Sequence, residues 1–202
     1  MLILSLLSGF ISQTPQTICL QPYNGFSKAE TEVVRSKLVV HFSEIMDRPF
    51  EIEILDGKTL PERFRNVRGT GFRADSILNY EKTFCPRKAI MIGLLKEDIT
   101  YTGKTDDECG IYGLSYTYGN VTVVSTFRPN RNEELWKVIL HEFIHTYYHL
   151  SHCEKDDPHC IMQEGHGLPR LYEKEGLCDD CKERIERKIT LSKYGLMNHR
   201  PL

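Results

Sequence analysis

The sequence predicts one α+β domain, close to the α/β class, with a small metal-bound segment near its C-terminus. Segments with strand and helix patterns alternate along most of the chain, which is typical of this fold class. A chain of 202 residues can bury one substantial core but is short for two full domains. Histidines crowd between residues 141 and 166, and cysteines between residues 153 and 181, as a metal site requires.

The overall charge argues against some classes of partner. The chain has 26 basic and 28 acidic residues, which gives a formal net charge of −2. Nucleic acids and anionic membranes are usually bound by basic surfaces, so we expect neither as a partner. No stretch is long and apolar enough for a stable membrane span.

Residues 1–16 differ from the domain that we expect over residues 17–202. The apolar run at residues 2–12 is similar to the core of a secretory signal. However, no basic residue precedes it and no clear cleavage site follows it. The alternatives are a signal-like segment, with an exported protein, and a disordered or strand-forming start, with a cytoplasmic one.

The first part of the chain is predicted to form strand, helix, strand and helix. Residues 18–22 have a strand composition and end at a proline. Ser27 and Glu30 form a Ser-x-x-Glu capping pattern, so the first helix begins there. Residues 50–55 alternate between apolar and polar as a strand does, and residues 73–80 fit a second helix.

The central part is predicted to supply the middle of a sheet. Residues 89–95 form a continuous apolar run that suits a central strand. Residues 98–113 carry Asp, Gly and Thr and are predicted to form a loop. Residues 113–118 and 120–126 fit a pair of neighbouring strands.

A long helix expected from about residue 132 to residue 150 carries His141, Glu142 and His145. Side chains four residues apart share one helix face, so both histidines could bind one zinc ion. Glu142 would then be the general base for a zinc-activated water, while the zinc polarises the carbonyl under attack. The alternative is an amphipathic helix with two surface histidines and a glutamate there by chance.

A catalytic zinc needs a third protein ligand. His149 continues the spacing of four, but it would lie about 12 Å along the helix axis from the first histidine, too far to share one ion. If the helix stops near Leu150 and the chain turns back, His152 can approach the ion from the other side. We therefore predict His152 as the third ligand and His149 as a surface residue or a neighbour of the site. His159 and His166 also lie downstream.

The four downstream cysteines allow two interpretations. Four thiolates suit a closed tetrahedral zinc site, whereas an exported protein could form disulfides instead. His159 could replace one thiol in a zinc site. Among the other cysteines, a disulfide between Cys85 and Cys109 would require export. The four cysteines are Cys153, Cys160, Cys178 and Cys181.

These motifs together resemble the archaemetzincins, a branch of the metzincin metallopeptidases. The resemblance rests on His-Glu-x-x-His from residue 141, His152-Cys153, Cys160-Ile161-Met162 and Cys178-x-x-Cys181. Weaker similarity extends upstream to about residue 17. The resemblance implies a metzincin-type single domain over residues 17–202, with a twisted mixed sheet and an active-site helix.

The resemblance also implies roles for individual residues. It implies a second, structural zinc on the four cysteines, hence two zinc ions per chain. Met162 would be an apolar floor beneath the catalytic zinc and not a ligand. Residues 121–126 would be the edge strand along which an extended peptide substrate binds.

The sequence departs from the family pattern after the active-site helix. The family has glycine at position 148 and the third histidine at position 151, where this chain has Tyr148 and Ser151. The His-Cys pair follows one residue late, and six residues instead of four separate Cys153 from Cys160. One extra residue could widen the turn, and His149 could adopt the left-handed conformation that glycine usually supplies.

We therefore predict a zinc metallopeptidase that acts on a peptide or protein substrate. The alternative is a zinc-stabilised peptide-binding module with weak or no catalysis, because the loop of the third ligand is altered. Glu142 favours the enzyme, since a binding module has no need of a carboxylate there. A zinc ribbon that binds nucleic acid is disfavoured by the acidic balance.

Overall fold

The computed structural model describes residues 14–102, 108–128, 134–164 and 171–194. The predicted signal-like stretch lies mostly outside these residues, as do the expected start of the active-site helix at residue 132 and His166. In the described part, no helix combines the length and the apolar character needed to cross a membrane.

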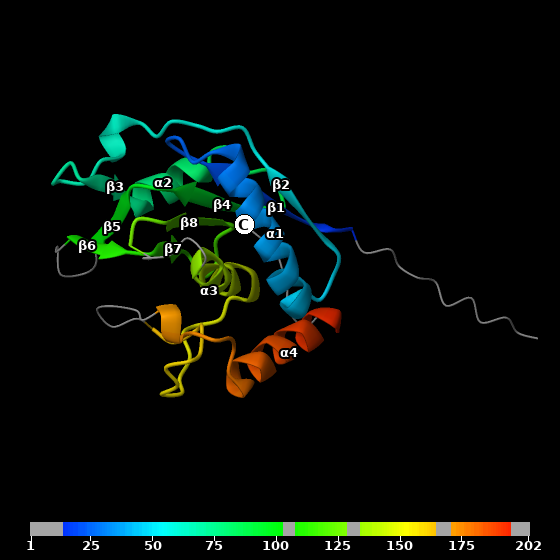
Figure 1. The fold of residues 1–202 in the computed structure, drawn as a ribbon. Coiled ribbons are helices and arrows are strands. Elements are labelled where there is room, and N and C mark those ends of the chain that lie inside the picture. Colours follow the sequence, from blue (N-terminus) through cyan, green and yellow to red (C-terminus); the bar gives the residue numbers. More distant parts are fainter. Residues whose placement is uncertain (1–13, 103–107, 129–133, 165–170, 195–202) are drawn as a thin grey trace, which may run out of the picture.

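Within the described residues, eight strands form two sheets, whose arrangement Figure 1 shows. The larger sheet has the order β2-β1-β4-β8-β7, in which the first four strands are parallel and β7 is antiparallel to β8. The smaller sheet has the order β3-β5-β6. The strands are β1 (Gln16–Pro22), β2 (Phe50–Ile54), β3 (Gly71–Arg73), β4 (Ile90–Leu95), β5 (Asp98–Thr102), β6 (Glu108–Ile111), β7 (Gly113–Ser115) and β8 (Val121–Ser125).

Helices cover both faces of the larger sheet. The apolar residues of β4 alternate between two cores, which is why this strand is buried on both sides. Ile92 packs with α1 and α3, whereas Met91 packs with α2 and the smaller sheet. The helices are α1 (Lys28–Ile45), α2 (Ala74–Glu81), α3 (Leu135–Tyr148) and α4 (Asp179–Lys193), with 3-10 turns at Glu62–Phe64 and Leu171–Glu173.

The predicted α+β class and the mixed sheet are confirmed, and so is the cap of α1. The Ser27 hydroxyl accepts the Glu30 N–H at 3.2 Å, and the Glu30 carboxylate accepts the Ser27 N–H at 2.9 Å. The predicted loop at residues 98–113 was wrong, because β5 and β6 form an antiparallel pair there.

The predicted edge strand was also wrong. Residues 121–126 correspond to β8, which pairs with β4 on one side and β7 on the other. All five residues of β8 are buried. On this side of the sheet the edge strand is β7, the neighbour of β8, so β7 is the strand that could receive a peptide.

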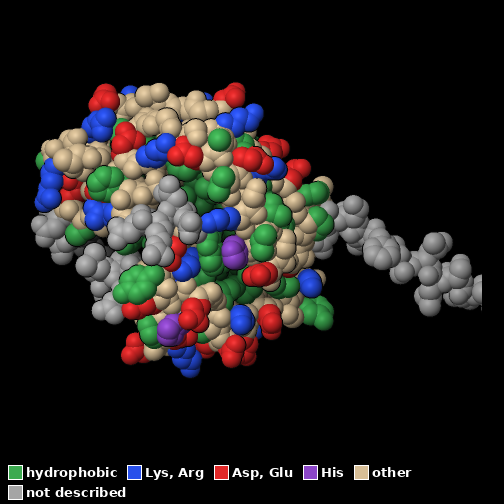
Figure 2. Space-filling model, viewed as in Figure 1, with side chains coloured by type: hydrophobic (Ala, Val, Ile, Leu, Met, Phe, Trp, Pro, Cys, Tyr) green, Lys and Arg blue, Asp and Glu red, His purple; other side chains and the backbone are tan. Residues whose placement is uncertain are grey.

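Charged side chains of both signs are interspersed over the face shown in Figure 2. No single sign dominates this face, which agrees with the small net charge of the chain.

Candidate functional site

α3 carries His141, Glu142 and His145 against the larger sheet. The apolar side chains of α3 pack into the core with α1 and β4, and this fixes which face of the helix remains for polar residues. The two histidines, four residues apart, have their Nε2 atoms 3.0 Å from each other. The helix therefore brings the two expected ligands together.

Backbone carbonyls fix both imidazole rings. The Nδ1 atom of His141 lies 2.8 Å from the oxygen of Ile161, and that of His145 lies 2.5 Å from the oxygen of Leu150. A carbonyl oxygen can only accept, so each Nδ1 carries the hydrogen and each Nε2 presents a lone pair. Burial lowers the pKa of both histidines, to about 4 for His145, where the neighbouring His141 contributes further. Both rings are therefore neutral near pH 7.

The chain reverses directly after α3. His149 is the C-cap residue of α3, and its backbone angles of φ 53° and ψ 40° lie in the left-handed region. A glycine usually supplies this conformation at the end of a helix, and the family pattern has a glycine one position earlier. The His149 Nδ1–H donates to the Thr117 carbonyl, and the ring stacks on Tyr118 with 5.3 Å between centroids. His149 therefore supports the turn and is not among the three histidines that converge.

The turn brings His152 to the other two histidines. Its ring centroid lies 5.2 Å from that of His141 and 4.7 Å from that of His145. One ligand nitrogen from each of the three rings lies within 4.8 Å of the others.

This set of nitrogen atoms fits a zinc ion. Zinc–nitrogen bonds of about 2.0–2.1 Å place two tetrahedral ligands roughly 3.3 Å apart, close to the 3.0 Å found between the Nε2 atoms. Two lone pairs at this distance repel each other unless a cation lies between them. Neutral imidazoles oriented by backbone carbonyls are the usual form of such ligands.

Glu142 lies beside these histidines and is only 8% exposed. The Ser115 hydroxyl on β7 donates to its Oε2 atom at 2.5 Å, which fixes the carboxylate. Burial raises the pKa of Glu142, and the bond from Ser115 and the proximity of His145 partly oppose this. Gly113 leaves space for the side chain, since a Cβ there would lie 2.9 Å from the Glu142 Cγ.

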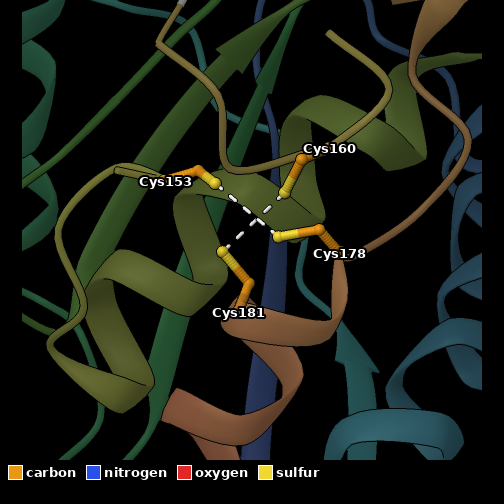
Figure 3. A group of neighbouring side chains, drawn as sticks. All are labelled: Cys153, Cys160, Cys178 and Cys181. Atoms are coloured by element: carbon orange, nitrogen blue, oxygen red, sulfur yellow. Dashed lines mark hydrogen bonds between the residues drawn. The ribbon is translucent and has the colours of Figure 1, made fainter. Parts of the chain in front are cut away.

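The four downstream cysteines converge below α3, and their sulfur atoms point toward one another (Figure 3). Two come from the segment after α3 and two from the start of α4. Sγ–Sγ distances are 3.6 Å between Cys153 and Cys178 and 3.7 Å between Cys160 and Cys181. A tetrahedron with zinc–sulfur bonds of about 2.3 Å has edges of roughly 3.8 Å.

These distances fit a zinc site and exclude disulfides in this structure, since an S–S bond is about 2.05 Å. Cys85 and Cys109 are also free thiols, so the disulfide considered for them is absent. His159 does not belong to the sulfur cluster, because its Nδ1 faces the carbonyl of Glu173 at 3.0 Å.

The two clusters share one piece of backbone. His152 and Cys153 are neighbours, and the Cys153 N–H donates to the carbonyl of Met162 at 2.7 Å. Met162 is 1% exposed, as an apolar floor requires. Arg184 of α4 donates to the His152 carbonyl at 3.1 Å and to the Ser151 hydroxyl at 2.8 Å.

Sequence reasoning did not identify Ser115, Gly113 and Arg184 as parts of the site. Each is distant in sequence from the residue that it supports, and no local pattern links the pairs. The only signal for α4 was the Cys-x-x-Cys pair at its start.

Comparisons with known proteins identify the fold. No protein-family model and no curated protein matches this chain. Solved structures do match, and two of them are archaemetzincins that cover most of the chain. The archaemetzincin of Methanopyrus kandleri has a TM-score of 0.72 and 22% identity, with 87% of this chain and 96% of that chain covered. The archaemetzincin of Archaeoglobus fulgidus, complexed with malonate, has a TM-score of 0.65 and 21% identity, with 84% and 99% covered. The chain therefore has the archaemetzincin fold that its motifs predicted.

Proposed function

We propose that this protein is a zinc metallopeptidase with two zinc ions. His141, His145 and His152 would hold the ion at the active site. The four cysteines named above would hold a structural ion. The observation that carries the proposal is the buried Glu142 carboxylate, which Ser115 fixes beside three converging histidines.

Glu142 would be the base of the reaction. A zinc ion held by the three imidazoles supplies Lewis acidity, which polarises a peptide carbonyl and acidifies water. The Glu142 carboxylate accepts a proton from the attacking water and passes it to the leaving nitrogen. The Ser115 hydroxyl keeps one carboxylate oxygen in place, so the other is available for this transfer.

The substrate would bind along β7. Among the described residues, β7 pairs with a strand on one side only, which leaves backbone groups for an extended peptide. Ser115 and Gly113 of this strand contact Glu142, so a peptide paired there would pass directly over the carboxylate. This arrangement favours a peptide or protein as the substrate.

A peptide-binding module without catalysis is the second candidate, because the turn before His152 differs from the family pattern. A module of this kind does not need a carboxylate fixed by a hydroxyl at the ligand cluster. We therefore favour the enzyme.

The test compares three variants for zinc content and peptidase rate. Glu142→Ala should keep zinc and lose about 100- to 10,000-fold in kcat, the usual contribution of a general base. His152→Ala should lose the active-site zinc and the activity, whereas His149→Ala should keep the zinc. If His149→Ala loses that zinc while His152→Ala keeps it, the proposed ligand set is wrong. A parent protein that cuts no peptide supports the binding module.

A further inference from the structure

A cavity of about 170 Å³ adjoins Glu142 and His141. Its walls come from α3, from Tyr112 and Gly113 at the start of β7, and from Ile161, Gln163, Leu171 and Lys174. This volume is enough for several water molecules or one side chain, but not for a whole peptide. It therefore has the size of a pocket for a single substrate residue next to the reacting bond.

The position of the cavity along β7 indicates which substrate residue would enter it. Antiparallel pairing is the slightly more stable mode, so we take the peptide to run opposite to β7. The C-terminal side of the peptide then lies next to the start of β7, where Tyr112 and Gly113 line the cavity. The residue that follows the scissile bond is the one that reaches this cavity.

Two lysines make the wall of the cavity basic. The Lys137 ammonium lies 3.1 Å from Glu134 and donates to the Leu171 carbonyl at 2.8 Å, so its charge is largely compensated. Lys174 is only 9% exposed and its ammonium forms no hydrogen bond or salt bridge among the described residues, although Cys160, Asp157 and Glu173 interact with its charge from a distance. A lysine with so little access to water lacks a direct acceptor here, and a carboxylate from the substrate would supply one.

The cavity also contains an unsatisfied amide. The Oε1 atom of Gln163 is buried and has no hydrogen-bond partner among the described residues. Rotation of the amide by half a turn would present its NH₂ group to an acceptor. An apolar side chain would leave both this amide and Lys174 unsatisfied, so the cavity is suited to a polar occupant.

Resting on the proposed function, we propose that this cavity binds a substrate carboxylate just after the scissile bond, with Lys174 as the main determinant. The carboxylate belongs either to an Asp or Glu side chain or to the peptide's own C-terminus. Glu142 is the acidic residue that lines the cavity, and its Oε2 is already held by Ser115.

The test uses zinc-loaded protein and three peptides that differ only after the scissile bond. Two have blocked ends and carry Glu or the isosteric Gln at that position; the third has Ala there as its free C-terminus. We expect kcat/KM for the Glu peptide to exceed that for the Gln peptide about tenfold or more, as a charge-assisted hydrogen bond implies. A still faster free-C-terminal peptide assigns the carboxylate to the chain end. Equal rates for all three peptides overturn the proposal.

Substitutions test whether Lys174 determines the preference for Glu over Gln. Lys174→Met should reduce the Glu-to-Gln ratio to near one, and Lys174→Arg should keep it. The exposed Lys182 provides the matched control, so Lys182→Met should leave the ratio unchanged. An unchanged ratio in Lys174→Met overturns the assignment.

Lys174 also interacts electrostatically with Cys160, so Lys174→Met could fail to fold. In that case Lys174→Gln, which keeps a polar side chain of similar length without the charge, should reduce the ratio to near one, and an unchanged ratio overturns the proposal. If the parent cuts none of the peptides, the proposed function fails. The pocket is then tested by calorimetric binding of the two blocked peptides, where equal affinities would overturn it.

Discussion

Glu81 is a fully buried carboxyl on the sheet face opposite α3. It lies at the end of α2, and neither of its oxygen atoms has a hydrogen-bond partner among the described residues. Burial raises its pKa well above that of a free glutamate, and the nearby Tyr23 hydroxyl opposes this only in part. Gly93 of the central strand makes room for it, since a Cβ at that position would collide with Oε1.

Glu81→Gln is expected to change how stability depends on pH. The folded pKa is raised, so the folded state holds the proton more tightly than the unfolded state. The stabilisation that comes from this raised pKa is fully present below the unfolded pKa of about 4.3, and it is lost as the pH rises toward the folded pKa. Between these two pKa values, the free energy of unfolding of the parent should fall by about 1.4 kcal/mol per pH unit relative to that of Glu81→Gln.

Urea unfolding of both proteins at pH 5, 6, 7 and 8 measures this difference. The contributions of other titrating groups are the same in both proteins and cancel in the difference between them. A change in stability that the amide causes at every pH does not alter how this difference varies with pH. A difference that stays constant with pH would show that Glu81 is ionised in the folded protein.

At the scale of elements, α4 links the two metal clusters. Cys178 is its N-cap residue and Cys181 lies in its first turn. Arg184, one turn later, holds the backbone of Ser151 and His152. The same helix therefore supplies two sulfur atoms to one site and orients a histidine of the other.

Arg184→Ala should weaken zinc binding at the histidine site about 10- to 100-fold, as loss of a group that orients a ligand usually does. The cysteine site should keep its ion. Arg187→Ala is the matched control, because the side chain of Arg187 pairs with the exposed Glu183 on the same helix. Zinc titrations against a competing chelator measure both affinities. Equal effects of the two substitutions would exclude the orienting role.

Strong local signals predicted part of the fold. The Ser27 cap, the apolar run of β4 and the periodicity of α3 each depend on neighbouring residues, and all three are confirmed. The strands at residues 98–113 were missed because β5 is buried at its start but exposed at its end, so it has neither a run nor an alternation. The edge position of β7 depends on pairing between strands, which local patterns do not specify.

The candidate site also combines features that neighbouring residues determine with features that depend on distant parts of the chain. Helix geometry brings His141 and His145 together, as the spacing predicts. Of the two ways considered to replace the family's glycine, a wider turn and a left-handed His149, the structure shows His149 in the left-handed conformation. The basic cavity was not foreseen, because Lys137 and Lys174 are 37 positions apart and meet only after the chain folds back.

At the scale of the whole molecule, the cysteine site would join α4 to the segment after α3. The apolar contacts of α4 with the core involve few buried residues, chiefly Cys181 and Ile185. The structural ion is therefore expected to contribute a large part of the stability of this region.

Cys178→Ser should lower the melting temperature by several degrees or more, because the ion is bound less tightly and contributes less folding free energy. Glu142→Ala, which removes no ligand, should melt near the parent. Thermal unfolding followed by circular dichroism makes the comparison. Equal losses in both variants would contradict the separation into a structural and a catalytic site.

The zinc content of His152→Ala and of the parent protein tests the central claim most directly. The proposal predicts two zinc ions per parent chain and one per His152→Ala chain, in protein purified under reducing conditions without chelator. X-ray absorption at the zinc edge of the variant should show only sulfur ligands, at about 2.3 Å. One ion or none in the parent, or nitrogen ligands on the ion that His152→Ala retains, would contradict it.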